Sequence, residues 1–245
     1  MILYFSATGN SKHVARKLAE ATGDRAISIE NLPPKVELAG DEVLGIVTPT
    51  YAWRIPAIVE RFLEALTLSG SAPSYAFCVA TYGTTPGASG PFLRKLLEQK
   101  IDCGVQLFSV RMTDTWTPMF DLSDKGRVED ANRAADVQVE KLCQSIARRE
   151  QSKRMPGQVP GFIIPIVNFY YESMRQTAKF TVEDSCIGCG LCAKRCPDSA
   201  IEVRDGRPVW TEPKCDKCLR CLHYCPKFAI QHGPKTKKHG QYHHS

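Results

Sequence analysis

The chain has 245 residues, of which 43% are hydrophobic, and its formal net charge is +6 at pH 7. This length suits one large and one small domain with an ordinary globular core. The sequence contains no run of about 18 apolar residues, so we expect no transmembrane helix. Residues 1–150 carry 17 Lys and Arg against 18 Asp and Glu, whereas residues 151–245 carry 15 against 8.

In residues 1–150, apolar runs alternate with amphipathic helical segments, which is the pattern of a parallel α/β sheet. We expect strands at residues 1–6, 26–30, 42–48, 75–81 and 105–111. We expect helices at residues 11–21, 56–66, 89–99 and 129–149. Five strands separated by helices predict a doubly wound, five-stranded parallel sheet, whose ligand binds beyond the carboxyl ends of the strands.

The loop after the first expected strand joins that strand to a helix N-terminus and reads Ser6-Ala7-Thr8-Gly9-Asn10-Ser11. Its backbone N–H groups and its hydroxyl groups could cradle a phosphate, helped by the helix dipole. The loop lacks the Gly-Lys-Ser/Thr ending of a Walker A motif and is not Gly-x-Gly-x-x-Gly. A helix N-cap rich in hydroxyl residues is the alternative interpretation.

Two further loops follow strands of the same sheet. The third strand is followed by Thr50-Tyr51-Ala52-Trp53, and the fourth by the polar, glycine-containing segment that includes Tyr82 and Gly83. A phosphate cradle, an aromatic platform and a polar loop at one sheet edge predict a flavin mononucleotide (FMN) site. Tyr51 or Trp53 would cover the isoalloxazine ring, although either side chain could instead seal the core.

Residues 151–178 are predicted to form a linker that is partly helical. Its apolar stretch, residues 162–171, contains Pro165 and is too short and too broken to span a membrane. This stretch could contact a partner or a second copy of the chain, a membrane surface, or the N-terminal domain. Because the last helix of the α/β domain ends opposite the ligand crevice, we expect the linker to carry the C-terminal domain back to that crevice, either of the same subunit or of a dimer mate.

Residues 179–232 contain two copies of the pattern Cys-x-x-Cys-x-x-Cys-x-x-x-Cys-Pro, 29 positions apart. Three thiolates at this spacing wrap a cubane cluster, and in the bacterial two-cluster pattern the fourth cysteine ligates the other cluster. The predicted ligands of one [4Fe–4S] cluster are Cys186, Cys189, Cys192 and Cys225. Those of the second are Cys215, Cys218, Cys221 and Cys196. Zinc is disfavoured because each run already supplies four cysteines.

This C-terminal α+β domain is too small to bury a large core, so the clusters should supply much of its stability. Residues 200–210 predict a hairpin with an Asp205-Gly206 turn. Residues 233–245 are predicted to be a disordered tail. Eleven cysteines without a recognisable secretory signal indicate a cytoplasmic, reducing environment. Cluster ligation would offset about four positive charges, so no nucleic-acid partner is expected.

The chain resembles the flavodoxin–ferredoxin fusion proteins of bacteria and archaea over nearly its whole length. The resemblance lies in the segments 4–11 and 50–56 and in the two cysteine runs. It implies a flavodoxin-like fold with strand order 2-1-3-4-5, non-covalent FMN and a two-cluster ferredoxin module. Carried over by position, the FMN contacts would be Ser6, Thr8, Gly9, Asn10, Ser11, Thr50, Tyr51, Ala52, Trp53, Tyr82 and Gly83.

These features predict an electron-transfer oxidoreductase that relays electrons between two [4Fe–4S] clusters and FMN, and exchanges them with a redox partner protein or a small molecule. Two alternatives stay open. One is an FMN-dependent reductase or dehydrogenase with its own quinone-like or porphyrin-like substrate, and the other is a non-enzymatic redox sensor that lost FMN. No nicotinamide-binding fingerprint is visible, no catalytic residue is assigned, and a homodimer stays open.

Overall fold

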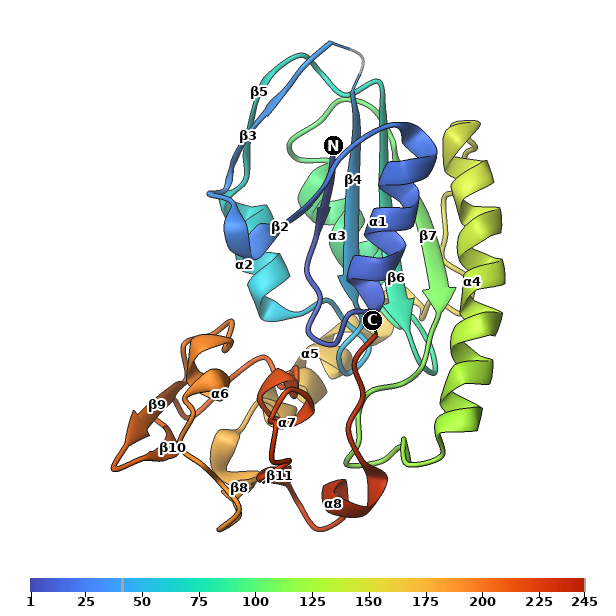
Figure 1. Ribbon diagram of the computed structural model, residues 1–245. Helices are drawn as coiled ribbons and strands as arrows, with labels where there is room; N and C mark the ends of the chain where they lie inside the picture. The colour runs from blue at the N-terminus through green and yellow to red at the C-terminus, as the bar shows by residue number, and fades with distance from the viewer. Residues whose placement is uncertain (41, 245) are drawn as a thin grey trace.

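The computed structural model describes residues 1–40 and 42–244 (Figure 1). Its centre is a five-stranded sheet of parallel strands in the order β2-β1-β4-β6-β7. The strands are β1 (Ile2–Tyr4), β2 (Ala26–Ser28), β4 (Val43–Pro49), β6 (Tyr75–Tyr82) and β7 (Val105–Arg111). Numbered along the chain within this sheet, the order is 2-1-3-4-5, so the predicted doubly wound fold is confirmed.

Helices cover both faces of the sheet (Figure 1). On one face lie α1 (Asn10–Thr22) and α4 (Lys125–Ala147), and on the other lie α2 (Ala57–Ala65) and α3 (Ser89–Leu97). The side chains of β6 alternate between the two layers, because Phe77 and Val79 pack with α1 and α4 whereas Cys78 packs with α2 and α3. Both faces of the sheet are therefore buried, as expected for parallel strands.

A small parallel pair of strands was not predicted. Strand β3 (Lys35–Leu38) pairs with β5 (Thr67–Gly70) in a separate two-stranded sheet beside the main one. In β3, Val36 and Leu38 are buried whereas Lys35 and Glu37 are exposed, so the strand follows the usual alternation of a half-buried strand. Each strand has only four residues, which gives a weak periodic signal in the sequence.

The segment between the two domains is largely helical. It contains the 3₁₀ turn η2 (Gly161–Ile163), helix α5 (Ile164–Met174) and a second 3₁₀ turn, η3 (Thr177–Lys179). Val167 and Tyr171 of α5 are buried, whereas Phe162, Ile166 and Phe169 are 82%, 66% and 79% exposed. Among the described residues, no helix is both long and apolar enough to cross a bilayer.

The C-terminal domain consists of two similar halves. Strand β8 (Phe180–Val182) pairs with β11 (Ile230–His232), and β9 (Ile201–Arg204) pairs with β10 (Arg207–Trp210) across the predicted Asp205-Gly206 turn. Each half has one short helix, α6 (Leu191–Lys194) or α7 (Arg220–His223), which contains the third cysteine of its run. The backbone repeats as well: φ is positive at Gly188, Gly190 and Ser199, and again 29 positions later at Lys217, Leu219 and Phe228.

The tail that follows β11 is ordered, so the prediction of a disordered tail is wrong for residues 233–244, while Ser245 lies outside the described residues. It includes the short helix α8 (Thr236–His239), and Tyr242 is only 5% exposed. The Gln241 side chain donates hydrogen bonds to the carbonyl oxygens of Leu222 and Cys225, at 2.7 and 2.8 Å. The polar, histidine-rich composition gave no sign of these contacts, because the partners are distant in the sequence.

Candidate functional site

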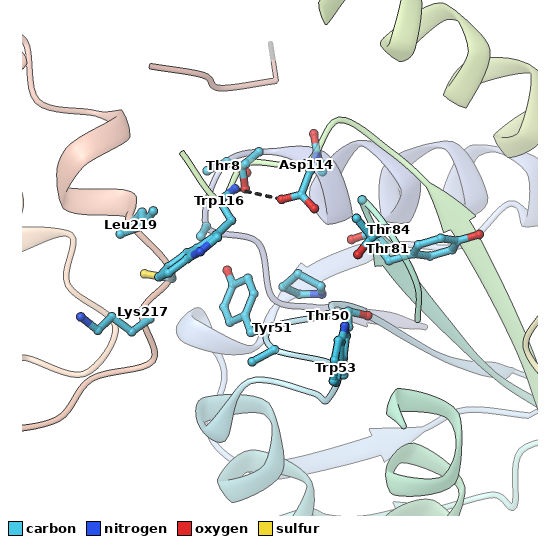
Figure 2. A pocket seen from close by; sticks show the side chains of 18 of the residues that line it. Thr8, Thr50, Tyr51, Trp53, Thr81, Thr84, Asp114, Trp116, Lys217 and Leu219 are labelled. Atoms are coloured by element: carbon cyan, nitrogen blue, oxygen red, sulfur yellow. Dashed lines mark hydrogen bonds between the residues drawn. The ribbon is translucent and has the colours of Figure 1, made fainter. Parts of the chain in front are cut away.

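A cavity of about 450 Å³ lies where the carboxyl ends of the main sheet meet the C-terminal domain (Figure 2). Its wall includes ten of the eleven residues predicted to contact FMN. These are Ser6, Thr8, Asn10, Ser11, Thr50, Tyr51, Ala52, Trp53, Tyr82 and Gly83. The structure therefore brings the three predicted loops together around one space, which we call the flavin cavity after the ligand predicted for it.

Gly9 is the one predicted contact that is not part of the cavity wall. Its φ of 102° lies in the left-handed region, and its backbone N–H donates to Ser6 Oγ at 3.1 Å. A Cβ atom at this position would lie 2.5 Å from the carbonyl oxygen of His244. Gly9 therefore faces the C-terminal tail, and both its conformation and this close approach require glycine.

The loop predicted to cradle a phosphate, residues 6–11, is held in place by polar contacts to neighbouring loops, and we call it the phosphate loop. Ser11 Oγ lies 2.8 Å from Thr81 Oγ1, and Asn10 Nδ2 donates to the carbonyl oxygen of Thr113 at 3.0 Å. The loop itself carries no charged side chain. A phosphate group would therefore depend on backbone N–H groups, hydroxyl groups, the Asn10 amide and the N-terminus of α1, which has 13 residues.

The loop that follows β4 and carries Tyr51 and Trp53 forms a tight two-residue turn. Tyr51 and Arg54 exchange backbone hydrogen bonds of 2.8 and 3.0 Å, and both residues between them have positive φ, 45° at Ala52 and 68° at Trp53. This conformation is uncommon for residues other than glycine and is found mainly where the surrounding structure imposes it, often at functional sites. Figure 2 shows the side chains of Tyr51, Trp53 and Trp116 around the flavin cavity.

Asp114 and Trp116 are cavity residues that come from the loop after β7. The Trp116 backbone N–H donates to Asp114 Oδ1 at 3.0 Å (Figure 2), and burial raises the pKa of the Asp114 carboxyl. A Cβ atom on Gly83 would lie 2.1 Å from Asp114 Oδ2, so glycine is needed opposite this carboxylate. Asp114 was not predicted as a site residue. Its position at the carboxyl end of the fifth strand could have indicated it, because ligands bind at that end of a parallel sheet.

Two smaller cavities each collect four cysteines. We call the first the outer cysteine site, lined by Cys186, Cys189, Cys192 and Cys225. The second is the inner cysteine site, lined by Cys196, Cys215, Cys218 and Cys221. These groups are the two crossed sets predicted from the spacing. In the described part of the chain, no three His, Cys, Asp or Glu side chains converge as they would on a single metal ion, and the eight thiols instead surround these cavities.

The surroundings of the thiols fit iron–sulfur clusters. Backbone N–H groups point at cysteine sulfurs at equivalent positions of the repeat, from Ala200 to Cys196 Sγ and from Ala229 to Cys225 Sγ, both at 3.3 Å. Such bonds stabilise the negative charge of a ligating thiolate. Burial raises the pKa of the Cys221 thiol well above its usual value, so without iron this sulfur would keep its proton. Soft thiolate donors of this kind are the ligands of Fe–S clusters.

The inner cysteine site and the flavin cavity share part of their walls. Cys218 and Leu219 line both cavities, and Lys217 is also part of the flavin-cavity wall, with its ammonium group directed away from the cavity toward His232 (Figure 2). The outer cysteine site lies nearer to solvent, because Cys189 is exposed and its neighbour Ile187 is 60% exposed. The linker thus carries the C-terminal domain back to the ligand edge of the sheet, as expected from the sequence, and of the two predicted alternatives the structure shows the site of the same chain.

Two charged side chains from the second cysteine run hold this arrangement. Asp216 accepts hydrogen bonds from the backbone N–H groups of Ala57 and Ile58 and from the Tyr171 hydroxyl, at 2.9, 2.9 and 3.1 Å. Arg220 donates to both carboxylate oxygens of Glu30, at 2.6 and 2.8 Å. Neither residue was predicted from the sequence, because both occupy positions where the cysteine pattern allows any side chain.

Arg220 also contacts the phosphate loop directly. Its guanidinium donates to the carbonyl oxygen of Ser6 at 2.8 Å, and its planar group lies over the Phe5 ring at 5.4 Å. The Arg220 side chain is only 11% exposed, so its ion pair with Glu30 is largely shielded from water. The inner cysteine site and the phosphate loop are therefore connected through one largely shielded guanidinium group.

Residues 1–139 match the family model described as a flavodoxin domain, and residues 178–226 match the one described as a 4Fe-4S dicluster domain. An uncharacterized polyferredoxin-like protein of Methanocaldococcus jannaschii is 37% identical over 65 residues, 21% of this chain and 39% of that protein. A component of an ion-translocating oxidoreductase complex of Methanosarcina acetivorans is 40% identical over 53 residues, 22% of this chain and 20% of that component.

The PorD subunit of pyruvate synthase from Thermotoga maritima is also similar, with 35% identity over 57 residues. That match covers 22% of this chain and 57% of the PorD polypeptide. Each of these matches spans less than two thirds of the relative, and each is about the length of one dicluster domain.

Proposed function

We infer the function from the family: the chain belongs to the flavodoxin domain family, and it carries a 4Fe-4S dicluster domain in the same polypeptide. This pairing is that of an electron-transfer protein. We propose that the chain relays electrons between two [4Fe–4S] clusters and a non-covalently bound FMN. When bound, the clusters exchange single electrons and the FMN takes up one or two.

The residues of the flavin cavity fit two parts of FMN, the phosphate and the isoalloxazine ring. Ser6, Thr8 and Ser11 offer hydroxyl groups to the phosphate, together with the N-terminus of α1. Tyr51 and Trp53 offer rings to the isoalloxazine. Burial raises the pKa of Tyr51 well above its usual value, so its phenol stays neutral and adds no charge beside the flavin.

The observation that carries the proposal is the shared wall of the two cavities. Cys218, a predicted cluster ligand, lines both the inner cysteine site and the flavin cavity, and so does Leu219. The inner cysteine site is therefore the neighbour of the flavin. The outer cysteine site, with Cys189 exposed, is the side on which we expect a redox partner protein to exchange electrons.

The task of the protein is then to hold these sites at a fixed separation and to keep water from the space between them. Asp216 and Arg220 fix the cysteine loop against the N-terminal domain through short hydrogen bonds. Leu219 is 2% exposed and fills the wall between the two cavities with an apolar side chain. Eight reduced thiols are needed for ligation, which suits a cytoplasmic protein.

Cofactor loading tests the proposal. The chain would be reconstituted anaerobically with iron, sulfide and FMN, and then titrated with a reductant while absorption and electron paramagnetic resonance are recorded. We expect two [4Fe–4S] clusters and one FMN per chain. Cys218→Ser should lose one cluster signal, whereas Cys143→Ser, which changes a cysteine of α4, should lose none. A chain that binds both clusters but no FMN would contradict the proposed relay.

A second candidate function is an FMN-dependent reductase that acts on its own small-molecule substrate. The observation in its favour is the rim of the flavin cavity, where Trp53, Met119 and Tyr170 are 44%, 65% and 41% exposed. Apolar side chains at an open rim suit a flat, apolar substrate such as a quinone or a porphyrin. Steady turnover of such a molecule without any partner protein would favour this function.

A further inference from the structure

A buried hydrogen-bond network joins the C-terminal tail to the flavin cavity. The hydroxyl group of Tyr242 donates to Asn10 Oδ1 at 2.7 Å and lies 3.1 Å from Asn132 Oδ1. Asn10 is part of the cavity wall, and its Nδ2 donates to the carbonyl oxygen of Thr113. The Thr113 hydroxyl closes the network by donating to Asn132 Oδ1 at 2.7 Å. Tyr242, Asn10 and Thr113 are each less than 9% exposed.

This network fixes which way the Asn10 amide points. A primary amide has one acceptor oxygen and two donor hydrogens. The phenol of Tyr242 donates to the oxygen, and burial raises its pKa to about 12, so it remains a donor at neutral pH. Thr113 accepts one of the two Nδ2 hydrogens, which leaves the second for an acceptor in the cavity. A phosphate oxygen is such an acceptor.

The backbone of the tail supports the same loop. The His244 N–H donates to the carbonyl oxygen of Thr8 at 2.7 Å, and Gly9 has no Cβ to keep the tail away. On its other side the tail is tied to the second cysteine run, through the bonds from Gln241 to Leu222 and Cys225. The phosphate loop is thus supported from outside the cavity by residues 241–244, which we call the C-terminal strap.

We propose that Tyr242 is a positioning residue for the phosphate end of the flavin, because it holds the Asn10 amide with its N–H directed into the cavity. The inference rests on the proposed FMN site. The C-terminal strap would therefore favour binding of a flavin that carries a phosphate monoester. Riboflavin, which has the same ring and ribityl chain but no phosphate, gains nothing from this amide.

The test compares the two flavins. Tyr242→Phe removes only the hydroxyl group, and the variant would be loaded with clusters, freed of flavin and titrated with FMN and with riboflavin under anaerobic conditions. Loss of one buried hydrogen bond to the loop should weaken FMN binding about five- to tenfold. The dissociation constant for riboflavin should change by less than about twofold, since its complex lacks the affected contact.

Tyr75→Phe is the matched control. Tyr75 is also buried, and its hydroxyl donates to the carbonyl oxygen of Glu150 at 2.6 Å, at the opposite end of the sheet from the flavin cavity. This variant should lose a comparable hydrogen bond and leave both flavin affinities unchanged. An equal weakening of FMN and riboflavin by Tyr242→Phe would overturn the inference, because it would indicate a general loss of structure.

A double-mutant cycle tests whether Tyr242 acts through Asn10. If it does, Tyr242→Phe should have no further effect on FMN affinity once Asn10→Ala is present. Additive losses would contradict the inference while leaving the FMN site in place. Unchanged FMN affinity in Tyr242→Phe would do the same. A wild-type chain that binds no FMN would overturn the proposed function itself, and the inference with it.

Discussion

The carboxylate of Asp216 caps a helix of the other domain, because it accepts the backbone N–H of Ala57, the first residue of α2, at 2.9 Å. The residue that precedes α2 is Pro56, which provides no side-chain cap. Asp216 lies between Cys215 and Cys218 of the inner cysteine site and is fully buried. One side chain therefore both completes a helix of the flavodoxin domain and fixes the cysteine loop that forms the wall of the flavin cavity.

Replacing this cap should destabilise both domains. Asp216→Ala leaves the Ile58 N–H and the Tyr171 hydroxyl without their acceptor, whereas the Ala57 N–H keeps the Tyr171 hydroxyl oxygen at 2.8 Å as its acceptor. Loss of a helix cap costs about 1–2 kcal/mol, and buried donors left without a partner cost more. We expect the thermal midpoint of the loaded protein to fall by roughly 4–8 °C. The intramolecular transfer of electrons to the flavin should also slow.

Asp124→Ala is the control for that substitution. Asp124 caps α4 through a bond from the Arg127 N–H at 3.0 Å, and it touches neither cysteine site. It should lower the thermal midpoint by the amount expected for an ordinary cap and leave electron transfer unchanged. Equal effects of the two variants on electron transfer would show that Asp216 does not fix the cysteine loop in a way that electron transfer depends on.

The ion pair between Arg220 and Glu30 should contribute far more to stability than the exposed ion pair between Arg204 and Glu202. Arg220→Lys keeps the charge but loses the planar fork that binds both Glu30 oxygens and the Ser6 carbonyl. We expect a loss of stability of about 1–3 kcal/mol and weaker FMN binding. Arg204→Lys alters an exposed pair with Glu202, for which the expected change is close to zero. Equilibrium unfolding and FMN titration of both variants would measure the contrast.

Most of the fold could be predicted from the sequence because its signals are local. The strands β4 and β6 are continuous apolar runs, and Cys186 to Cys225 form two regular patterns. The loops that follow the strands must meet at one edge of a parallel sheet, so the grouping of Ser6, Tyr51 and Tyr82 could be derived from topology alone.

The residues that join the domains could not be predicted, for a physical reason. Asp216, Arg220 and Tyr242 act through hydrogen bonds to partners more than 150 positions away in the sequence. No periodicity or spacing reports such contacts, and in a single sequence a buried Asp or Arg looks like a surface charge. The prediction of a disordered tail fails for the same reason, since only Tyr242 in the tail resembles a core residue.

Removing the iron should affect the flavin cavity as well as the C-terminal domain. The small core of that domain depends on Phe180, Leu222 and Ile230 packed around the cysteines, so metal loss should unfold it. Lys217, Cys218 and Leu219 form part of the cavity wall, and we expect FMN to be bound more weakly after anaerobic chelation. Circular dichroism and FMN titration should recover together when iron and sulfide are restored. Native circular dichroism in the iron-free protein would contradict this dependence.

The Asp114 carboxyl should give a defined pH dependence. Burial raises its pKa in the folded protein, whereas the unfolded chain has a pKa of about 3.9. Between these values the folded protein keeps a proton that the unfolded chain has released, so stability falls as the pH rises. Asp114→Asn does not ionise, and its thermal midpoint should therefore rise relative to that of the wild type as the pH increases above about 4.

Asp121→Asn should show the opposite sign. Hydrogen bonds from Ser123 lower the pKa of the exposed Asp121 carboxyl. The ionised Asp121 stabilises the fold above the unfolded pKa, and this stabilisation is lost as the pH falls. The thermal midpoint of Asp121→Asn should therefore decrease relative to that of the wild type as the pH rises. Midpoint differences that stay constant with pH in both variants would contradict both assignments.

The shared wall formed by Cys218 and Leu219 predicts that electrons pass from the inner cysteine site to the flavin within one chain. The fully loaded protein would be mixed anaerobically with a limiting amount of a one-electron donor, and flavin absorbance would be followed at several protein concentrations. If the inner cysteine site delivers electrons to the flavin of its own chain, the rate constant of flavin reduction will not change with protein concentration. A rate constant that rises in proportion to protein concentration would contradict electron transfer within one chain.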